Sequence, residues 1–82
     1  MLLRVMDEVI ELGGLGVALL CTAGEPRDGM CIRDARSNVH TVESVAEADG
    51  LFTMYIPQGD AAYFGRLFRD VRVDATLFEE AE

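Results

Sequence analysis

The sequence predicts an all-β fold: one small antiparallel β-barrel, closed or partly open, formed by residues 1–82 as a single domain. Glycine, proline, asparagine and aspartate recur in clusters that leave short runs between them, and several runs are rich in β-branched and aromatic side chains. Such runs separated by turn residues are typical of small sandwiches and barrels. A chain of 82 residues is also near the lower size limit for a domain that forms its own core.

The first run, residues 2–12, carries a pattern that favours an amphipathic helix. Its polar residues recur with helical spacing: Arg4, Asp7, Glu8 and Glu11. Apolar residues fill the opposite face. On this pattern alone, a helix is favoured over a strand. A third interpretation of the protein, in which such a helix docks on a partner, requires residues 2–12 to be helical.

The runs in the middle of the chain are better suited to strands. Residues 16–22 (GVALLCT) are apolar, bracketed by turn residues and too short for a typical helix. Residues 51–56 (LFTMYI) are aromatic and β-branched and alternate between two faces, which predicts a strand. Residues 38–48 begin with a β-branched cluster and end with a more helix-like composition.

The stretch IPQGDAAYFGRLFRDV, residues 56–71, has two interpretations. It opens with a type I turn, because Pro57 stands at the second turn position and Gly59 at the fourth. An amphipathic helix after this turn would carry Gly65 in mid-span at a cost of about 1 kcal/mol. A strand would use Gly65 as a bend or bulge. We therefore predict a strand over residues 61–68.

The charge balance is strongly acidic. Fifteen acidic residues stand against seven arginines and no lysine, for a net charge of −8. A field of this sign repels polyphosphate and opposes nucleic-acid binding, unless arginines gather locally. The candidates for such a patch, with a tyrosine that could stack on a base, are Arg33, Arg36, Arg66, Arg69 and Tyr63.

Residues that carry catalytic or metal chemistry are sparse. Cys21 and Cys31 lack the spacing of a redox or zinc motif, and His40 is the one histidine. Ser37 and Ser44 flank His40 in sequence, but this spacing alone does not define a triad. We therefore predict no enzymatic activity, no cofactor and no metal.

Neither the run lengths nor the N-terminus indicates a membrane or secreted protein. No apolar run approaches the roughly 18 residues that a membrane span requires. The first ten residues contain acids where a secretory signal must be apolar. We expect no membrane association and a cytoplasmic location.

Two stretches resemble the second domain of elongation factor Tu-type translation GTPases, a small β-barrel. They are MDEVIELGGLGVALLCT (residues 6–22) and IPQGDAAYFGRLFRDV (residues 56–71). The matching residues are Glu8, Val9, Ile10, Leu12, Gly14, Gly16, Gly59, Asp60, Gly65, Leu67, Arg69 and Val71. The likeness spans about residues 3–78, on short anchors rich in glycine.

The resemblance implies a fold more than an activity. It implies a strand over residues 3–12, against the local helical pattern, and we adopt this prediction. It also implies structural turn roles for Gly14, Gly16, Gly59, Asp60 and Gly65: a Gly-x-Gly hairpin turn with positive φ, and a Gly-Asp turn that places a polar cap at the barrel mouth.

Departures from the family put its RNA contacts in doubt. The sequence contains no Gly-x-x-x-x-Gly-Lys-Ser/Thr phosphate loop and no Asn-Lys-x-Asp motif. Leu15 stands where elongation factors usually carry an arginine, and Cys21 stands where they carry a glycine. The loop over residues 24–29 is shorter than its counterpart.

Together these observations predict a stand-alone, non-catalytic binding module. We expect a protein partner, associated with translation, and self-association through open edge strands. The alternative is an RNA- or ribosome-binding module that uses the arginines and Tyr63 named above.

Overall fold

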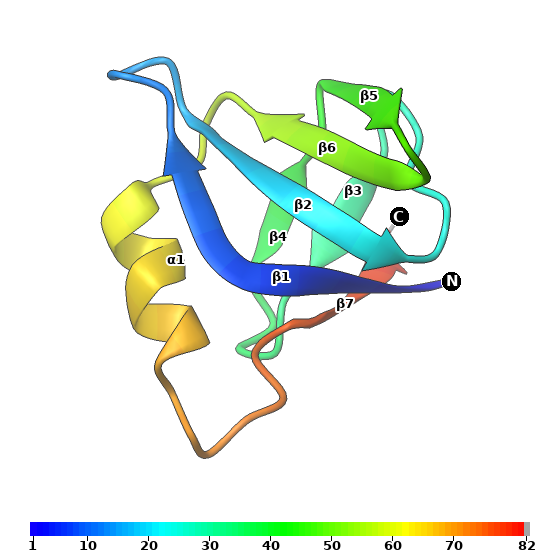
Figure 1. The fold of residues 1–82 in the computed structure, drawn as a ribbon. Helices are drawn as coiled ribbons and strands as arrows, with labels where there is room; N and C mark the ends of the chain where they lie inside the picture. The colour runs from blue at the N-terminus through cyan, green and yellow to red at the C-terminus, as the bar shows by residue number, and fades with distance from the viewer. Residues whose placement is uncertain (82) are drawn as a thin grey trace.

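A computed structural model of the protein describes residues 1–81, which form seven strands and one helix (Figure 1). In chain order the elements are β1 (Leu2–Glu11), β2 (Val17–Ala23), β3 (Cys31–Arg33), β4 (Val39–Thr41), β5 (Ser44–Ala48), β6 (Leu51–Ile56), α1 (Ala61–Phe68) and β7 (Leu77–Ala81). Strands account for 48% of the residues, which confirms the all-β prediction.

The strands form one antiparallel sheet in the order β4-β3-β7-β1-β2-β6-β5. The end strands of this order, β4 and β5, are consecutive in the chain. Between them, the Val42 amide donates to the Met30 carbonyl at 2.8 Å, next to β3, whereas the Glu43 amide donates to the Tyr55 carbonyl of β6 at 2.9 Å. The segment over residues 39–48 therefore changes its partner at mid-length and links the two ends of the sheet. This link makes the sheet barrel-like.

The N-terminal strand prediction is confirmed, and a bulge explains the helical pattern of its sequence. Val5 faces Cys21 in β2, and Val9 faces Leu19, so four steps along β1 match two along β2. The intervening residues 6–8 are exposed. Strict alternation would place Asp7 on the inner face, and the bulge keeps its carboxylate in water instead.

The strand predicted over residues 61–68 is wrong, because these residues form α1. Asp60 is the helix N-cap, and its carboxylate accepts a hydrogen bond from the Ala62 amide at 3.0 Å, so Asp60 caps a helix and not a barrel mouth. Phe64 and Leu67, three residues apart, are fully buried. Gly65 is a helical residue, and a Cβ there would meet only the Arg69 guanidinium, at 3.7 Å. It is therefore neither a bend nor a bulge.

Both predicted glycine turns are present. The Leu12 amide donates to the Gly16 carbonyl at 3.1 Å, which closes the hairpin between β1 and β2. Gly16 has a φ of 101°, and a Cβ there would lie 2.4 Å from the Ile56 carbonyl oxygen. The Gly59 amide donates to the Ile56 carbonyl at 3.0 Å, as a type I turn requires.

The core fills the space between the sheet and α1, which packs against β1 (Figure 1). Its largest fully buried side chains are Phe64, Phe78, Leu3, Leu19, Ile32, Met54, Ile56 and Leu67. Cys21 belongs to this core, and burial raises the pKa of its thiol. Among residues 1–81, no helix is both long enough and apolar enough to span a membrane.

Candidate functional site

The loop between β3 and β4 holds a buried carboxylate. Asp34 is the one buried charged residue among residues 1–81, and its side chain is fully shielded from solvent. Its Oδ1 accepts hydrogen bonds from the backbone amides of Arg36, at 2.8 Å, and Asn38, at 3.0 Å. Ser37 adopts a φ of 69°, which lets the chain turn tightly around the carboxylate. The loop is therefore built around this one side chain.

The second oxygen of Asp34 joins this loop to β4 and α1. Oδ2 accepts hydrogen bonds from His40 Nε2, at 2.8 Å, and from the Tyr63 hydroxyl, at 2.5 Å. The Tyr63 oxygen in turn accepts a hydrogen bond from Asn38 Nδ2 at 2.7 Å. We refer to Asp34, Asn38, His40 and Tyr63 as the Asp34 network.

Opposing effects act on the ionisation of this network. Burial by itself would raise the pKa of the Asp34 carboxyl, but the hydrogen bonds from Tyr63, His40 and two backbone amides outweigh it and lower the pKa. Asp34 is therefore ionised at neutral pH. Burial raises the pKa of the Tyr63 hydroxyl, and its hydrogen bond to Asp34 raises it further. Tyr63 thus stays protonated and donates.

His40 is held in one orientation. Its ring packs against Phe64, with 4.7 Å between ring centroids, and against Tyr63 at 5.7 Å. Because the Asp34 carboxylate only accepts, Nε2 of the ring carries a hydrogen and donates it to Oδ2. Within residues 1–81, the Nδ1 atom of His40 has no hydrogen-bond partner. Every buried side-chain nitrogen and oxygen in these residues does have a partner, so Nδ1 is not buried and reaches the surface.

A hollow lies on the surface where His40 meets the start of α1. Its volume is about 310 Å³, and it is lined by Asn38, His40, Gln58, Gly59, Asp60 and Tyr63. We call it the His40 hollow. Three segments build it: the β3–β4 hairpin, the turn after β6 and the first turn of α1.

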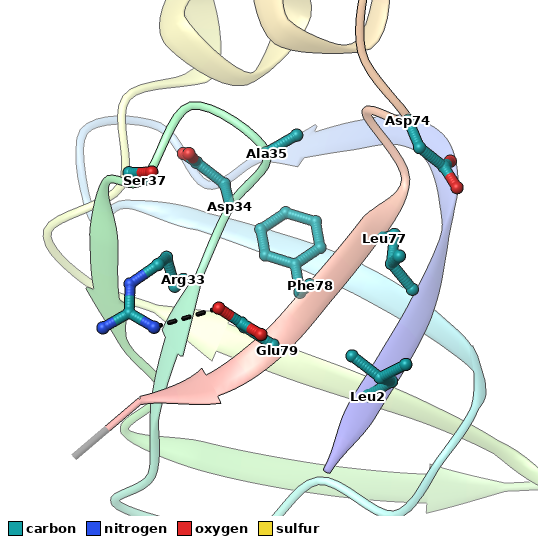
Figure 2. Close-up of a pocket in the computed structure, with 9 residues that line it drawn as sticks. All are labelled: Leu2, Arg33, Asp34, Ala35, Ser37, Asp74, Leu77, Phe78 and Glu79. Carbon is teal, nitrogen blue, oxygen red and sulfur yellow. Dashed lines mark hydrogen bonds and ion pairs between the residues drawn. The ribbon is translucent and has the colours of Figure 1, made fainter.

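A second depression, the Arg33 groove, lies over β3, β7 and β1 (Figure 2). Its lining residues are Leu2, Arg33, Asp34, Ala35, Ser37, Asp74, Leu77, Phe78 and Glu79. Arg33 and Glu79 form an ion pair at 3.0 Å along one side of it, as Figure 2 shows. The charges that border this groove are thus partly neutralised by the chain itself.

The structure separates the arginines that the sequence grouped. Arg33 pairs with Glu79, and Arg36 pairs with Asp70 at 2.8 Å. Hydrogen bonds from Arg72 and Arg36 hold the pKa of the Asp70 carboxyl below its usual range. Arg66, in α1, and Arg69, its C-cap, are exposed and form no ion pair within residues 1–81.

Of the predicted contact residues, Tyr63 alone lines the His40 hollow, while Arg36 contributes its backbone amide to the Asp34 loop. Sequence reasoning did not select Asp34, Asn38 or Gln58, and it treated His40 as an isolated histidine. The one local signal is an aspartate ahead of a turn, since such residues commonly accept hydrogen bonds from amides two residues on. Among fifteen acidic residues, this signal does not single out Asp34.

No family model, curated protein or solved structure compared with this chain matches it. Within residues 1–81, no group of three or more histidine, cysteine, aspartate or glutamate side chains is placed to hold a metal ion. The interpretation of the site therefore depends on its own geometry: a buried carboxylate that is fully hydrogen-bonded, and a surface hollow rich in acceptors.

Proposed function

We propose that this protein is a non-catalytic binding module whose partner is another protein. The observation that carries the proposal is the pairing of arginines with the chain's own carboxylates. Five of the seven arginines are paired in this way: Arg4, Arg27, Arg33, Arg36 and Arg72.

The pairing determines what the surface offers to a partner. Each ion pair cancels one positive charge locally, and the chain retains a net charge of −8. A surface of this kind repels phosphate and attracts basic groups. Basic groups are supplied by protein side chains, so the charge pattern supports a protein partner over a nucleic acid.

The Asp34 network supports a binding role in place of catalysis. Both carboxylate oxygens accept two hydrogen bonds each, and the donors belong to the loop, to β4 and to α1. A carboxylate that is fully used in this way positions its neighbours, and it holds the His40 ring in one orientation. We therefore assign the Asp34 network a structural role, in which it maintains the shape of a binding surface.

The relationship to the second domain of elongation factor Tu-type GTPases stays part of this proposal. The barrel-like sheet and the Gly-x-Gly hairpin support it. The link to translation and the cytoplasmic location are proposed on the same basis.

One observation favours RNA or ribosome binding as a second candidate function. Arg66 lies in the last turn of α1 and Arg69 is the C-cap of this helix, three residues further on, so the two are neighbours at its C-terminal end. Both are exposed and without an ion pair within residues 1–81. Two arginines at one helix end are a small basic patch on an acidic body.

Affinity capture separates the two candidates. The tagged wild-type protein and an R66Q/R69Q double variant are each incubated with cell lysate at low and at high salt, with and without ribonuclease. The proposal predicts a protein partner that survives ribonuclease and is retained equally by both proteins. RNA-dependent material that is lost on ribonuclease treatment, at high salt and in the double variant would replace the proposal with the second candidate.

A further inference from the structure

We propose that the His40 hollow binds a cationic side chain of the protein partner, a lysine ammonium or an arginine guanidinium. This inference rests on the proposed function, because it names the chemistry of the partner that the module recognises. It is carried by the acceptor groups around the hollow, by its charge and by its size.

Asp60, Asn38 and Gln58 bring acceptor oxygens to the lining residues of the hollow. His40 lines the hollow, and its Nε2 is held by Asp34 at 2.8 Å, so the ring is fixed in place there. One oxygen of Asp60 accepts from the Ala62 amide, which leaves its second oxygen available. The side-chain oxygens of Asn38 and Gln58 add two further acceptors. Ammonium and guanidinium groups are pure donors, so they complement this set.

The charge near the hollow has the matching sign. Asp60 contributes a carboxylate at its edge, and the ionised Asp34 carboxylate lies directly behind His40 and Tyr63. The start of α1 carries a partial positive charge that opposes a cation, of about half an elementary charge at most. Two carboxylates outweigh it. The Tyr63 ring adds an aromatic surface of the type on which cations pack.

The size of the hollow suits one side chain. Its volume of about 310 Å³ lies at the lower end of the range for ligand pockets, roughly 300–1,000 Å³. A drug-sized ligand would fill a larger cavity, whereas the end of a lysine or arginine side chain fits within this one. Among the residues that line the hollow, only His40 and Asp60 are of the types that commonly bind metal ions. A protein metal site usually has at least three such ligands, so the lining does not suit a metal ion.

The test is a nuclear magnetic resonance titration of the labelled full chain with small probes. N-acetyl-arginine amide is compared with N-acetyl-citrulline amide, and N-acetyl-lysine amide with N-acetyl-norleucine amide. Citrulline has nearly the shape of arginine without its charge, and norleucine keeps most of the aliphatic stem of lysine without the ammonium group. We expect saturable shifts of the amides of His40, Gly59 and Tyr63 with the charged probes, and weaker binding of the neutral ones.

Asp60→Asn is the matched variant, because asparagine caps a helix as well as aspartate and only the charge is removed. We expect it to bind the cationic probes about fivefold more weakly, as loss of one exposed charge pair predicts. Asp49→Asn is the control: it removes the same charge from the β5–β6 turn, across the barrel from α1 (Figure 1). We expect it to bind as the wild type does.

Three results would overturn the inference: no saturable shift, equal shifts with the neutral probes, or equal weakening by both variants. Equal weakening by both variants would show that the net charge of the protein, and not the His40 hollow, attracts the probes. Failure here is distinct from failure of the proposed function. If Asp60→Asn still captures a ribonuclease-resistant protein from lysate as well as the wild type does, the binding module stands and a different surface holds its partner.

Discussion

At the scale of single residues, Asp34 shows how a charged group is accommodated in a small core. A carboxylate removed from water loses its hydration, and this loss is tolerated when other donors replace it. Four donors do so here: two backbone amides, His40 and Tyr63. The same four contacts hold the loop, β4 and α1 together. The stability of the fold and the shape of the His40 hollow therefore depend on one side chain.

Replacing Asp34 with alanine should be strongly destabilising. The substitution leaves buried donors without an acceptor, and we expect the free energy of unfolding to fall by about 3 kcal/mol. Urea denaturation followed by circular dichroism measures it. Asp7→Ala is the control, since Asp7 is exposed in the β1 bulge and should change stability by less than about 0.5 kcal/mol. Equal effects of the two substitutions would contradict the role given to Asp34.

The lowered pKa of Asp34 predicts how stability depends on pH. The folded-state pKa of Asp34 lies below the ordinary value of 3.8, so its contribution is fully present above about pH 4. It is lost as the pH falls through the folded-state value, because the unfolded chain then takes up the proton first. The stability difference between wild type and Asp34→Asn should thus shrink below about pH 4. Urea unfolding of both proteins at a series of pH values tests this, and a constant difference would contradict it.

At the scale of elements, the turns and the strands β1, β2 and β6 could be predicted from sequence, whereas β5 and α1 could not. The turn at Pro57 and Gly59 and the strand over Leu51–Ile56 follow from local chemistry alone. The strand prediction over residues 61–68 depended on the helix penalty of Gly65, whereas in the structure Asp60 caps the helix and Phe64 and Leu67 are buried. Tertiary burial of these two side chains outweighs an intrinsic cost of about 1 kcal/mol.

The two glycines Gly65 and Gly16 should respond oppositely to alanine. Gly65→Ala removes the helix penalty and places a Cβ in ordinary contact with Arg69, so stability should rise by about 0.5–1 kcal/mol. Gly16→Ala forces a side chain into positive φ and against the backbone of Ile56 and Pro57, so stability should fall by about 2 kcal/mol or more. Urea midpoints measure both. A loss of stability in Gly65→Ala would count against α1 as described.

At the scale of the whole molecule, the candidate site was beyond prediction because it exists only after folding. Asn38, Gln58 and Tyr63 lie on three separate segments, and the curvature of the barrel-like sheet brings them together. Sequence spacing carries no information about this meeting. Tyr63 is among the predicted contact residues because of its aromatic ring. His40 is not, because nothing in the sequence distinguishes its partner Asp34 from the other acidic residues. The site thus depends on barrel closure, which is itself testable.

Closure predicts slow hydrogen exchange at the joint between β4 and β5. The Val42 amide bonds toward β3 and the Glu43 amide bonds to β6, and Val42 is fully buried. Both amides should therefore exchange only when the barrel opens globally, at rates within about tenfold of the most protected amides of β2. Native-state exchange observed by nuclear magnetic resonance measures these rates, with the exposed Asp49–Gly50 turn as the fast internal reference. Exchange at Glu43 as fast as in that turn would mean that the ends of the sheet separate in solution. The His40 hollow, which needs both ends in place, would then form only part of the time.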